Sequence, residues 1–172
     1  MKIVKQPNHA ENSSLLIKLL VLDVDGTMTD GRIYIGCDGE MMKAFCVKDG
    51  YAIAEMLPKN GITPIIITGR QSKIVENRAK ELGIKQVYQG IKDKPILLKK
   101  IAEEQEISFA EVAYIGDDLN DYDAMMLCEF KACPADAAPK VREFCDYVSP
   151  NKGGHGAVRD ICEFILKHNE NE

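Results

Sequence analysis

The fold of this chain is indicated by the stretch Leu19-Leu20-Val21-Leu22-Asp23-Val24-Asp25-Gly26-Thr27. Four apolar residues stop at an aspartate, and a second aspartate follows two positions later. A short, continuous apolar run suits a strand that is buried on both faces of a parallel sheet. The acidic pair then stands at the carboxyl end of that strand, where open α/β sheets bind their ligands.

Two later segments repeat this pattern, with Ile65-Ile66-Ile67 stopping at Thr68 and Val112-Ala113-Tyr114-Ile115 stopping at Gly116-Asp117. Apolar residues at helical spacing fill the segments between these runs. The expected helices cover residues 49–60, 72–82 and 93–105, and a further strand covers residues 86–89. Strands that alternate with helices predict a doubly wound α/β fold with a parallel sheet, as a single domain over residues 1–172.

Residues 32–47 interrupt this alternation directly after the first acidic motif. Two β-prone runs flank Cys37-Asp38-Gly39-Glu40, and an Asp-Gly pair between such runs is a hairpin signal. We therefore expect a β-hairpin that serves as a flap over the site, an interface between subunits, or both. The polar residues 1–14 and the tail at residues 168–172 are expected to be flexible. The glycine-rich turn at residues 153–156 is interpreted as a flexible approach to a final helix.

The overall composition narrows the classes of function. The chain has 172 residues and a net charge of −5, which argues against nucleic acid as a partner because phosphate backbones require a basic surface. Residues 1–14 lack the apolar stretch of a signal peptide, and the run at residues 15–24 is too short to cross a membrane. The six cysteines lack the Cys-x-x-Cys spacing of a zinc site. They are typical of small buried residues in a reducing compartment, so we expect a soluble cytoplasmic protein, with disulfides as the alternative.

Polar groups follow each of the main predicted strands. They are Asp23 and Asp25 after the first, Thr68, Gly69 and Arg70 after the second, Asp117, Asp118 and Asp121 after the third, and Lys94 after residues 86–89. These groups should converge, because the carboxyl ends of parallel strands meet at one edge of the sheet. Thr68 and the N–H of Gly69 can donate to phosphoryl oxygens, and Lys94 can neutralise their charge. The guanidinium of Arg70 can bind a carboxylate bidentately, through two hydrogen bonds. Lys48, beside the base of the hairpin, is a further candidate to contact a substrate.

Carboxylates packed this closely repel one another, so some should bind protons unless a cation lies between them. Mg²⁺ takes oxygen ligands, keeps several waters and suits a site that it shares with a phosphate. Asp23 and Asp117 are the best direct side-chain ligands, with the backbone carbonyl of Asp25 as a third. Asp118 and Asp121 are expected to hold metal-bound waters or to support the ligands, and Asp118 also suits a helix N-cap.

In their order and spacing, these motifs resemble the four motifs of the haloacid dehalogenase superfamily. They are Asp23-Val24-Asp25-Gly26-Thr27, Ile67-Thr68-Gly69-Arg70, Lys94 and Gly116-Asp117-Asp118-Leu119-Asn120-Asp121. The resemblance implies that Asp23 attacks a phosphate monoester and forms an aspartyl-phosphate. It also implies that Asp25 protonates the departing alkoxide and later takes a proton from the attacking water.

No large insertion interrupts these motifs, since only the hairpin follows the first and 25 residues separate Thr68 from Lys94. The chain thus resembles the capless subclass of the superfamily. That resemblance implies a homotetramer that forms through the hairpins, in which neighbouring subunits help to close each site.

A closer resemblance extends over nearly the whole chain. It rests on Val47-Lys48-Asp49-Gly50-Tyr51, Tyr88-Gln89-Gly90, residues 112–118 and Gly153-Gly154-His155-Gly156-Ala157-Val158-Arg159. It points to the branch of the superfamily that hydrolyses 3-deoxy-D-manno-octulosonate 8-phosphate in lipopolysaccharide precursor synthesis. The nine-carbon branch tends to carry an acidic residue where Arg70 stands, so Arg70 favours the eight-carbon substrate.

Three other functions would use part of the same residue pattern. The nearest is a phosphatase for a nine-carbon 2-keto-3-deoxy sugar acid 9-phosphate, of the KDN or N-acylneuraminate type. Phospho-accepting regulatory domains also combine an aspartate, a threonine, a lysine and Mg²⁺, but they lack the second aspartate that Asp25 supplies here. A catalytically silent assembly subunit would not need the whole motif set. Outside these motifs, His155 is interpreted as a surface residue, and Arg159 as either a structural residue or a substrate contact.

Overall fold

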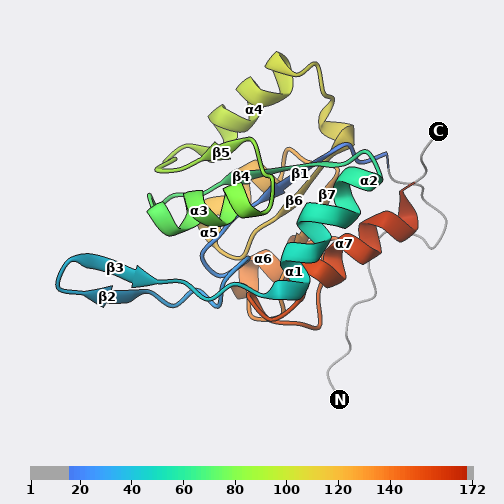
Figure 1. Cartoon of the computed structure of the whole chain (residues 1–172). Coiled ribbons are helices and arrows are strands. Elements are labelled where there is room, and N and C mark those ends of the chain that lie inside the picture. The colour runs from blue at the N-terminus through green and yellow to red at the C-terminus, as the bar shows by residue number, and fades with distance from the viewer. Residues whose placement is uncertain (1–15, 170–172) are drawn as a thin grey trace.

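A computed structural model describes residues 16–169 of the chain (Figure 1). The expected flexibility of residues 1–14 lies outside these described residues. Six parallel strands form the central sheet, in the order β5-β4-β1-β6-β7-β8. The strands are β1 (Leu19–Leu22), β4 (Thr63–Ile67), β5 (Val87–Tyr88), β6 (Val112–Ile115), β7 (Phe130–Cys133) and β8 (Tyr147–Val148). The predicted parallel sheet is confirmed, and β7 and β8 extend it beyond the strands that the sequence indicated.

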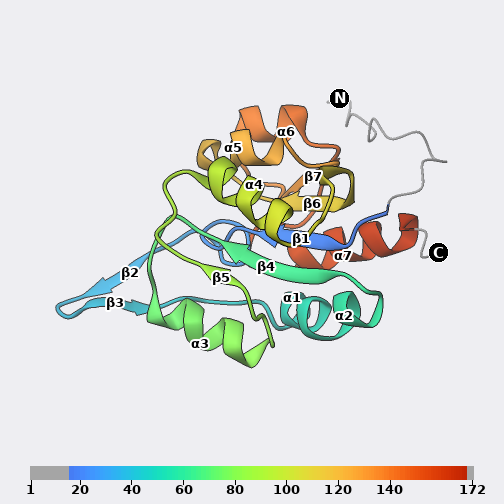
Figure 2. The ribbon, with the colours of Figure 1, turned by 90° about the horizontal axis from the view of Figure 1, so that it is seen from above.

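Helices cover both faces of this sheet, as Figure 2 shows from above. The first face carries α1 (Val47–Tyr51), the π-helix η1 (Ala52–Met56), α2 (Leu57–Lys59), α3 (Lys73–Glu81) and α7 (Ala157–His168). The second face carries α4 (Lys94–Glu104), α5 (Leu119–Met125) and α6 (Pro139–Phe144), and the 3-10 helix η2 (Phe109–Glu111) precedes β6. The doubly wound α/β fold is therefore confirmed.

Strand β1 lies at the centre of the molecule. Leu20 and Leu22 pack into the core on the first face of the sheet, and Leu19 and Val21 into the core on the second face. All four side chains are fully buried, and each contributes about 1.5–3 kcal/mol by leaving water. Burial on both faces explains the continuous apolar run and fixes the strand end from which Asp23 emerges.

The predicted hairpin is present and projects away from the sheet (Figure 1). Its strands are β2 (Tyr34–Gly36) and β3 (Gly39–Met42), which pair antiparallel across a two-residue turn. They are shorter than the predicted segment of residues 32–47, since the chain leaves the ladder after Met42 and enters α1 at Val47. No cap domain interrupts the fold within residues 16–169.

The C-terminal part of the chain is more tightly held than the sequence suggested. The backbone N–H of Ile17 donates to Asn169 Oδ1 at 2.6 Å, and Asn169 Nδ2 donates to the carbonyl of Ile17 at 3.1 Å. His168 is still part of α7. The expectation of fraying is thus wrong for these last two described residues, because they join the end of α7 to the start of β1. The remainder of the tail, residues 170–172, lies outside the described part of the chain.

The turn at residues 153–156 is also not a loose connection. Gly153 is buried, and a Cβ atom there would lie 1.9 Å from the carbonyl oxygen of Gly26 and 2.8 Å from that of Thr29. The N–H of Gly154 donates to the carbonyl of Thr27 at 3.2 Å. Glycine is required because the two backbones approach this closely, so the turn supports the loop that follows β1.

All six cysteines carry free thiols, which removes the disulfide alternative. Cys128, Cys133 and Cys162 are buried as expected, whereas Cys37 is exposed in the hairpin turn. None of the helices within residues 16–169 has both the length and the hydrophobicity needed to cross a lipid bilayer.

Gly153→Ala should destabilise the fold more than Gly61→Ala. The new methyl group at position 153 meets two backbone oxygens, and overpacking of this kind costs about 1–3 kcal/mol or more. Gly61 has a φ of +73° with nothing within 4 Å of an added Cβ, so alanine there adds only backbone strain of about 1 kcal/mol. Urea unfolding measures the free energy of unfolding of both variants. Equal decreases would show that the turn at residues 153–156 can move to make room for the added methyl group.

Candidate active site

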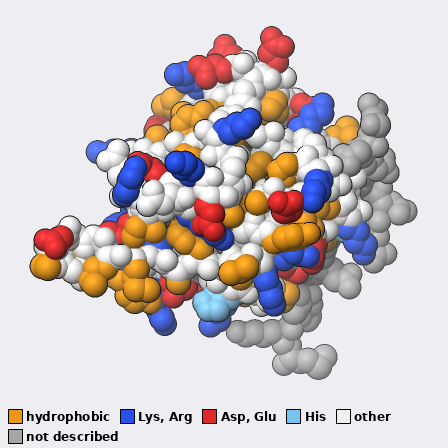
Figure 3. All heavy atoms as spheres, viewed as in Figure 1, with side chains coloured by type: hydrophobic (Ala, Val, Ile, Leu, Met, Phe, Trp, Pro, Cys, Tyr) orange, Lys and Arg blue, Asp and Glu red, His pale blue; other side chains and the backbone are white. Residues whose placement is uncertain are grey.

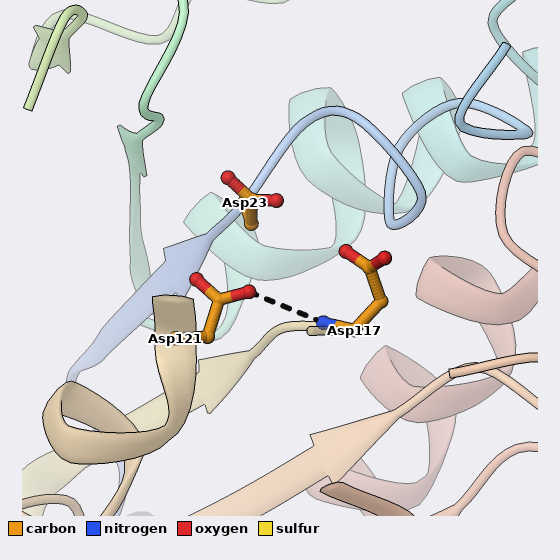
Figure 4. A group of neighbouring side chains, drawn as sticks. All are labelled: Asp23, Asp117 and Asp121. Carbon is orange, nitrogen blue, oxygen red and sulfur yellow. Dashed lines mark hydrogen bonds between the residues drawn. The ribbon is translucent and has the colours of Figure 1, made fainter. Parts of the chain in front are cut away.

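Three carboxylates meet at the carboxyl edge of the sheet (Figure 4). Asp23 follows β1, Asp117 follows β6, and Asp121 lies in the first turn of α5. One oxygen from each lies within 4.8 Å of the other two. Asp23 and Asp121 are buried, and Asp117 is partly buried. An all-oxygen donor set of this size fits a hard divalent cation such as Mg²⁺.

Lys94 joins this group from the first turn of α4. Its Nζ lies 2.8 Å from Asp23 Oδ1 and 2.6 Å from Asp121 Oδ1, and its side chain is only 1% exposed. Burial by itself would lower the pKa of Lys94, but the charges of the two carboxylates and their hydrogen bonds raise it above the ordinary value. The ammonium group therefore stays charged and can face both the aspartates and a phosphoryl group.

Two hydroxyl groups that the sequence analysis assigned no role also hold this site together. Tyr114 Oη donates to Asp121 Oδ1 at 2.9 Å, and Thr27 Oγ1 donates to Asp117 Oδ1 at 3.1 Å. The N–H of Asp117 adds a bond to Asp121 Oδ2 at 3.3 Å, drawn as the dashed line in Figure 4. A signal for Tyr114 was available, because a phenol inside a fully buried strand needs a hydrogen-bond partner.

The carboxylates are crowded enough to hold protons in the absence of a cation. Burial, followed by the charge of Asp121, raises the pKa of Asp23 to about 6, although Lys94 opposes the shift. Burial and then the charges of Asp23 and Asp121 raise the pKa of Asp117 to about 8. One lysine thus compensates only part of the negative charge, and a divalent cation would compensate the rest.

The carboxylate of Asp25 lies among groups from the hairpin and from the turn after β4. Lys43 Nζ donates to Asp25 Oδ1 and lies 2.8 Å from Glu40 Oε1. Arg70 Nε lies 3.8 Å from Asp25 Oδ2, and the Arg70 side chain is 47% exposed. The structure therefore places the Arg70 side chain beside Asp25. Lys43 was not among the predicted site residues, although it is the only cation in the apolar run of residues 41–47.

The remaining predicted site residues differ in how far they are exposed to solvent. Thr68 is buried at the end of β4, and Gly69 follows it at the surface. Lys48 is exposed on α1. Asp118 is exposed and its Oδ1 accepts the N–H of Leu119 at 2.8 Å, as the N-cap of α5.

Arg159 makes structural contacts rather than joining the carboxylate group. Its N–H donates to the buried Asp49 Oδ1 at 2.8 Å, and its guanidinium pairs with Glu163 at 2.6 Å and lies over the ring of Tyr51. His155 is exposed and its Nδ1 lies 2.8 Å from the carbonyl of Gly153. Asp49 thus connects α1 to the start of α7.

Comparison with known proteins gives consistent results. Residues 46–126 match the family model described as haloacid dehalogenase-like hydrolase. The 3-deoxy-D-manno-octulosonate 8-phosphate phosphatase of Salmonella typhi is 44% identical over 158 residues, which cover 92% of this chain and 84% of the relative. The enzyme of the same description from Escherichia coli K12 is 45% identical over 150 residues, or 87% of this chain and 79% of the relative.

Solved structures of such phosphatases share the fold. The enzyme from Moraxella catarrhalis, solved in complex with a magnesium ion, a phosphate ion and a KDO molecule, superposes with a TM-score of 0.85. It is 42% identical, and the match covers 89% of this chain and 87% of that one. The cobalt-bound enzyme of Haemophilus influenzae has the same TM-score at 35% identity, with 88% of each chain covered.

Stabilisation of the fold by Mg²⁺ should increase with pH. Because the pKa values of Asp23 and Asp117 are raised to about 6 and 8, the folded metal-free protein binds protons that the unfolded chain releases above about pH 4. Its free energy of unfolding should therefore fall as the pH rises through this window. Mg²⁺ competes with those protons, so the increase in Tm on adding Mg²⁺ should be larger near about pH 8 than near about pH 5.5.

Thermal unfolding with and without Mg²⁺ at the two pH values measures this effect. Asp117→Asn should remove most of the increase in Tm, whereas Asp123→Asn, at an exposed position of the same helix region, should retain it. An increase of equal size at both pH values in the wild-type protein would contradict the proton competition.

Proposed function

Because this chain belongs to the haloacid dehalogenase-like hydrolases, we propose that it hydrolyses 3-deoxy-D-manno-octulosonate 8-phosphate to the free sugar acid and phosphate. The observation that carries the proposal is the 44% identity to such a phosphatase over 92% of the chain. The meeting of Asp23, Lys94 and Asp117 at one sheet edge supports it independently. The relatives named above are phosphatases, which favours this activity over a phospho-accepting regulatory domain.

In the proposed reaction, an oxygen of Asp23 attacks phosphorus and the bond from phosphorus to the ester oxygen breaks. An aspartyl-phosphate forms on Asp23, while Asp25 gives its proton to the departing alkoxide. Asp25 then takes a proton from a water molecule that attacks the same phosphorus, which releases phosphate and restores Asp23. General acid–base help of this kind accelerates a reaction by about 10²–10⁴-fold.

The other proposed site residues bind the metal ion and the phosphoryl group. Asp23 and Asp117 would hold Mg²⁺ through their side chains and Asp25 through its carbonyl, with Asp118 and Asp121 in support. The ion, when bound, screens the negative charge that otherwise repels the attacking carboxylate. Thr68, the N–H of Gly69 and Lys94 are proposed to bind the phosphoryl oxygens.

Recognition of the sugar acid is assigned to Arg70 and Lys48. Arg70 is half-exposed beside Asp25, so its guanidinium is accessible to the carboxylate of a substrate whose ester oxygen accepts the Asp25 proton. Lys48 is a second candidate, in its own site or in that of a neighbouring subunit. A nine-carbon keto sugar acid 9-phosphate carries the same two anionic groups and is the alternative substrate.

We also propose that the protein assembles as a homotetramer through its hairpins and works in the cytoplasm. Hydrophobic side chains gather on the hairpin, which points to the left in Figure 3. The exposed ones are Ile33, Tyr34, Ile35, Met41 and Met42. Apolar residues on a projecting element are typical of a protein interface. The free thiols of all six cysteines suit a reducing compartment.

The purified protein should hydrolyse the eight-carbon 8-phosphate with a kcat/KM at least about tenfold above that for nine-carbon 9-phosphates, a difference of about 1.4 kcal/mol. Arg70 is the physical reason, since a carboxylate that accepts two parallel hydrogen bonds from one guanidinium is held in a defined position. Release of inorganic phosphate measures both rates. Equal rates would remove the assignment of Arg70 as a selector, and no release from either substrate would contradict the proposed function.

The same assay tests the two aspartates. Asp23→Asn should abolish turnover, because an amide cannot form the phosphorylated intermediate, and Asp25→Asn should lower kcat by about 10²-fold or more. Asp123→Asn is the matched control and should keep full activity. Normal hydrolysis by Asp23→Asn would show that another group is the nucleophile.

Charge on the hairpin should break the assembly. Ile35 is 71% exposed, so Ile35→Glu leaves the monomer intact but buries a carboxylate in the proposed interface, at a cost of several kcal/mol. Sedimentation should show a tetramer for the wild type and smaller species for the variant. Ile96→Glu, at a 66% exposed position on α4, is the control that should remain tetrameric. A wild-type monomer at every concentration would contradict the proposal.

A further inference from the structure

A cation from the hairpin holds the carboxylate that is proposed to transfer protons. Lys43 follows β3, and its side chain is only 1% exposed. Its Nζ donates to Asp25 Oδ1 and lies 2.8 Å from Glu40 Oε1. A buried ammonium group is costly unless it is paired, so these two carboxylates define where Lys43 lies.

A chain of hydrogen bonds fixes Lys43 relative to the sheet. Glu40, on β3, accepts a hydrogen bond from Ser72 Oγ. Ser72 is the N-cap of α3, and its N–H donates to Gln89 Oε1 at 2.8 Å in the segment after β5. The end of the hairpin is thereby attached to α3 and to the segment after β5, so Lys43 reaches Asp25 from a defined position.

The two cations beside Asp25 differ in how strongly they interact with its carboxylate. The Lys43 contact is a direct hydrogen bond from a buried group. Arg70 Nε is 3.8 Å from Asp25 Oδ2, and nearly half of the Arg70 side chain faces solvent, where charge interactions are screened. Lys43 is therefore the stronger of these two restraints on the orientation of the Asp25 carboxylate.

We propose that Lys43 is a positioning residue, which orients Asp25 for proton transfer to the leaving alkoxide and so makes the hairpin part of the catalytic apparatus. This inference rests on the proposed function. A proton donor must be held within hydrogen-bond reach of the leaving oxygen, and small errors in its position cost large factors in rate. Met41 and Met42, two of the exposed residues of the proposed interface, end β3 and immediately precede Lys43, so assembly and proton transfer depend on one short segment.

Three phosphate esters test this role in Lys43→Met, which removes the charge and retains the length of the side chain. Two are alkyl esters with poor leaving groups, namely the octulosonate 8-phosphate and glycerol 3-phosphate, which lacks a carboxylate. The third is 4-nitrophenyl phosphate, whose leaving group needs little protonation. We expect kcat/KM to fall by about tenfold or more for both alkyl esters, and by less than about threefold for the aryl ester.

Controls separate this role from the other roles open to Lys43. Lys59→Met removes an exposed lysine that pairs with Glu55 at 2.7 Å, and should leave all three rates unchanged. Lys43→Arg should restore part of the alkyl-ester rates by returning a donor to Asp25. Circular dichroism of each variant reports on the fold.

Two patterns of results would overturn the proposal. An equal fall for all three esters would show that Lys43 is structural. A fall confined to the sugar acid, seen as a raised KM with kcat unchanged, would show that Lys43 binds the substrate. If the wild type does not hydrolyse the octulosonate ester, the proposed function fails, while glycerol 3-phosphate and 4-nitrophenyl phosphate still test Lys43.

Discussion

Lys94 lies buried between Asp23 and Asp121, with its Nζ 2.8 Å and 2.6 Å from their oxygens. These contacts join the end of β1, the start of α4 and the first turn of α5. A charge left unpaired in such a place would cost several kcal/mol, so the three elements can meet only in an arrangement that pairs the lysine. The network extends to Tyr114, which donates to the same oxygen of Asp121. The position of the proposed nucleophile therefore follows from how a buried cation is satisfied.

The charge balance around Lys94 explains why the site suits a metal. Asp117 adds a third carboxylate, and burial with its neighbours' charges raises its pKa to about 8. A site in this condition binds protons or a cation, and the two compete. Structures of similar phosphatases hold magnesium or cobalt, which agrees with the oxygen donors found here. The same crowding that would destabilise an isolated protein thus becomes the source of metal affinity.

Two segments outside the central motifs contact the loop that follows β1. The glycine turn at residues 153–156 approaches its backbone so closely that no side chain fits at Gly153. Lys43 connects the hairpin to Asp25 in the same loop. The loop is therefore held by distant parts of the chain as well as by its own strand. This support is consistent with a site in which the attacking and proton-transferring groups must keep a fixed separation.

The sequence by itself determined where Asp23, Thr68 and Asp117 emerge, because an apolar run that ends at a polar residue marks a buried strand and its carboxyl end. It also indicated the hairpin from a local turn signal. Only the tertiary structure decided which groups touch. Lys43 and Asp25 are 18 positions apart, and Thr27 and Asp117 are 90 apart, and no periodic pattern specifies such pairs. The expectations for the glycine turn and for His168 and Asn169 were wrong for the same reason. These residues hold a fixed conformation because they contact backbone that is distant in the sequence, whereas sequence patterns report only the local conformational preference of the chain.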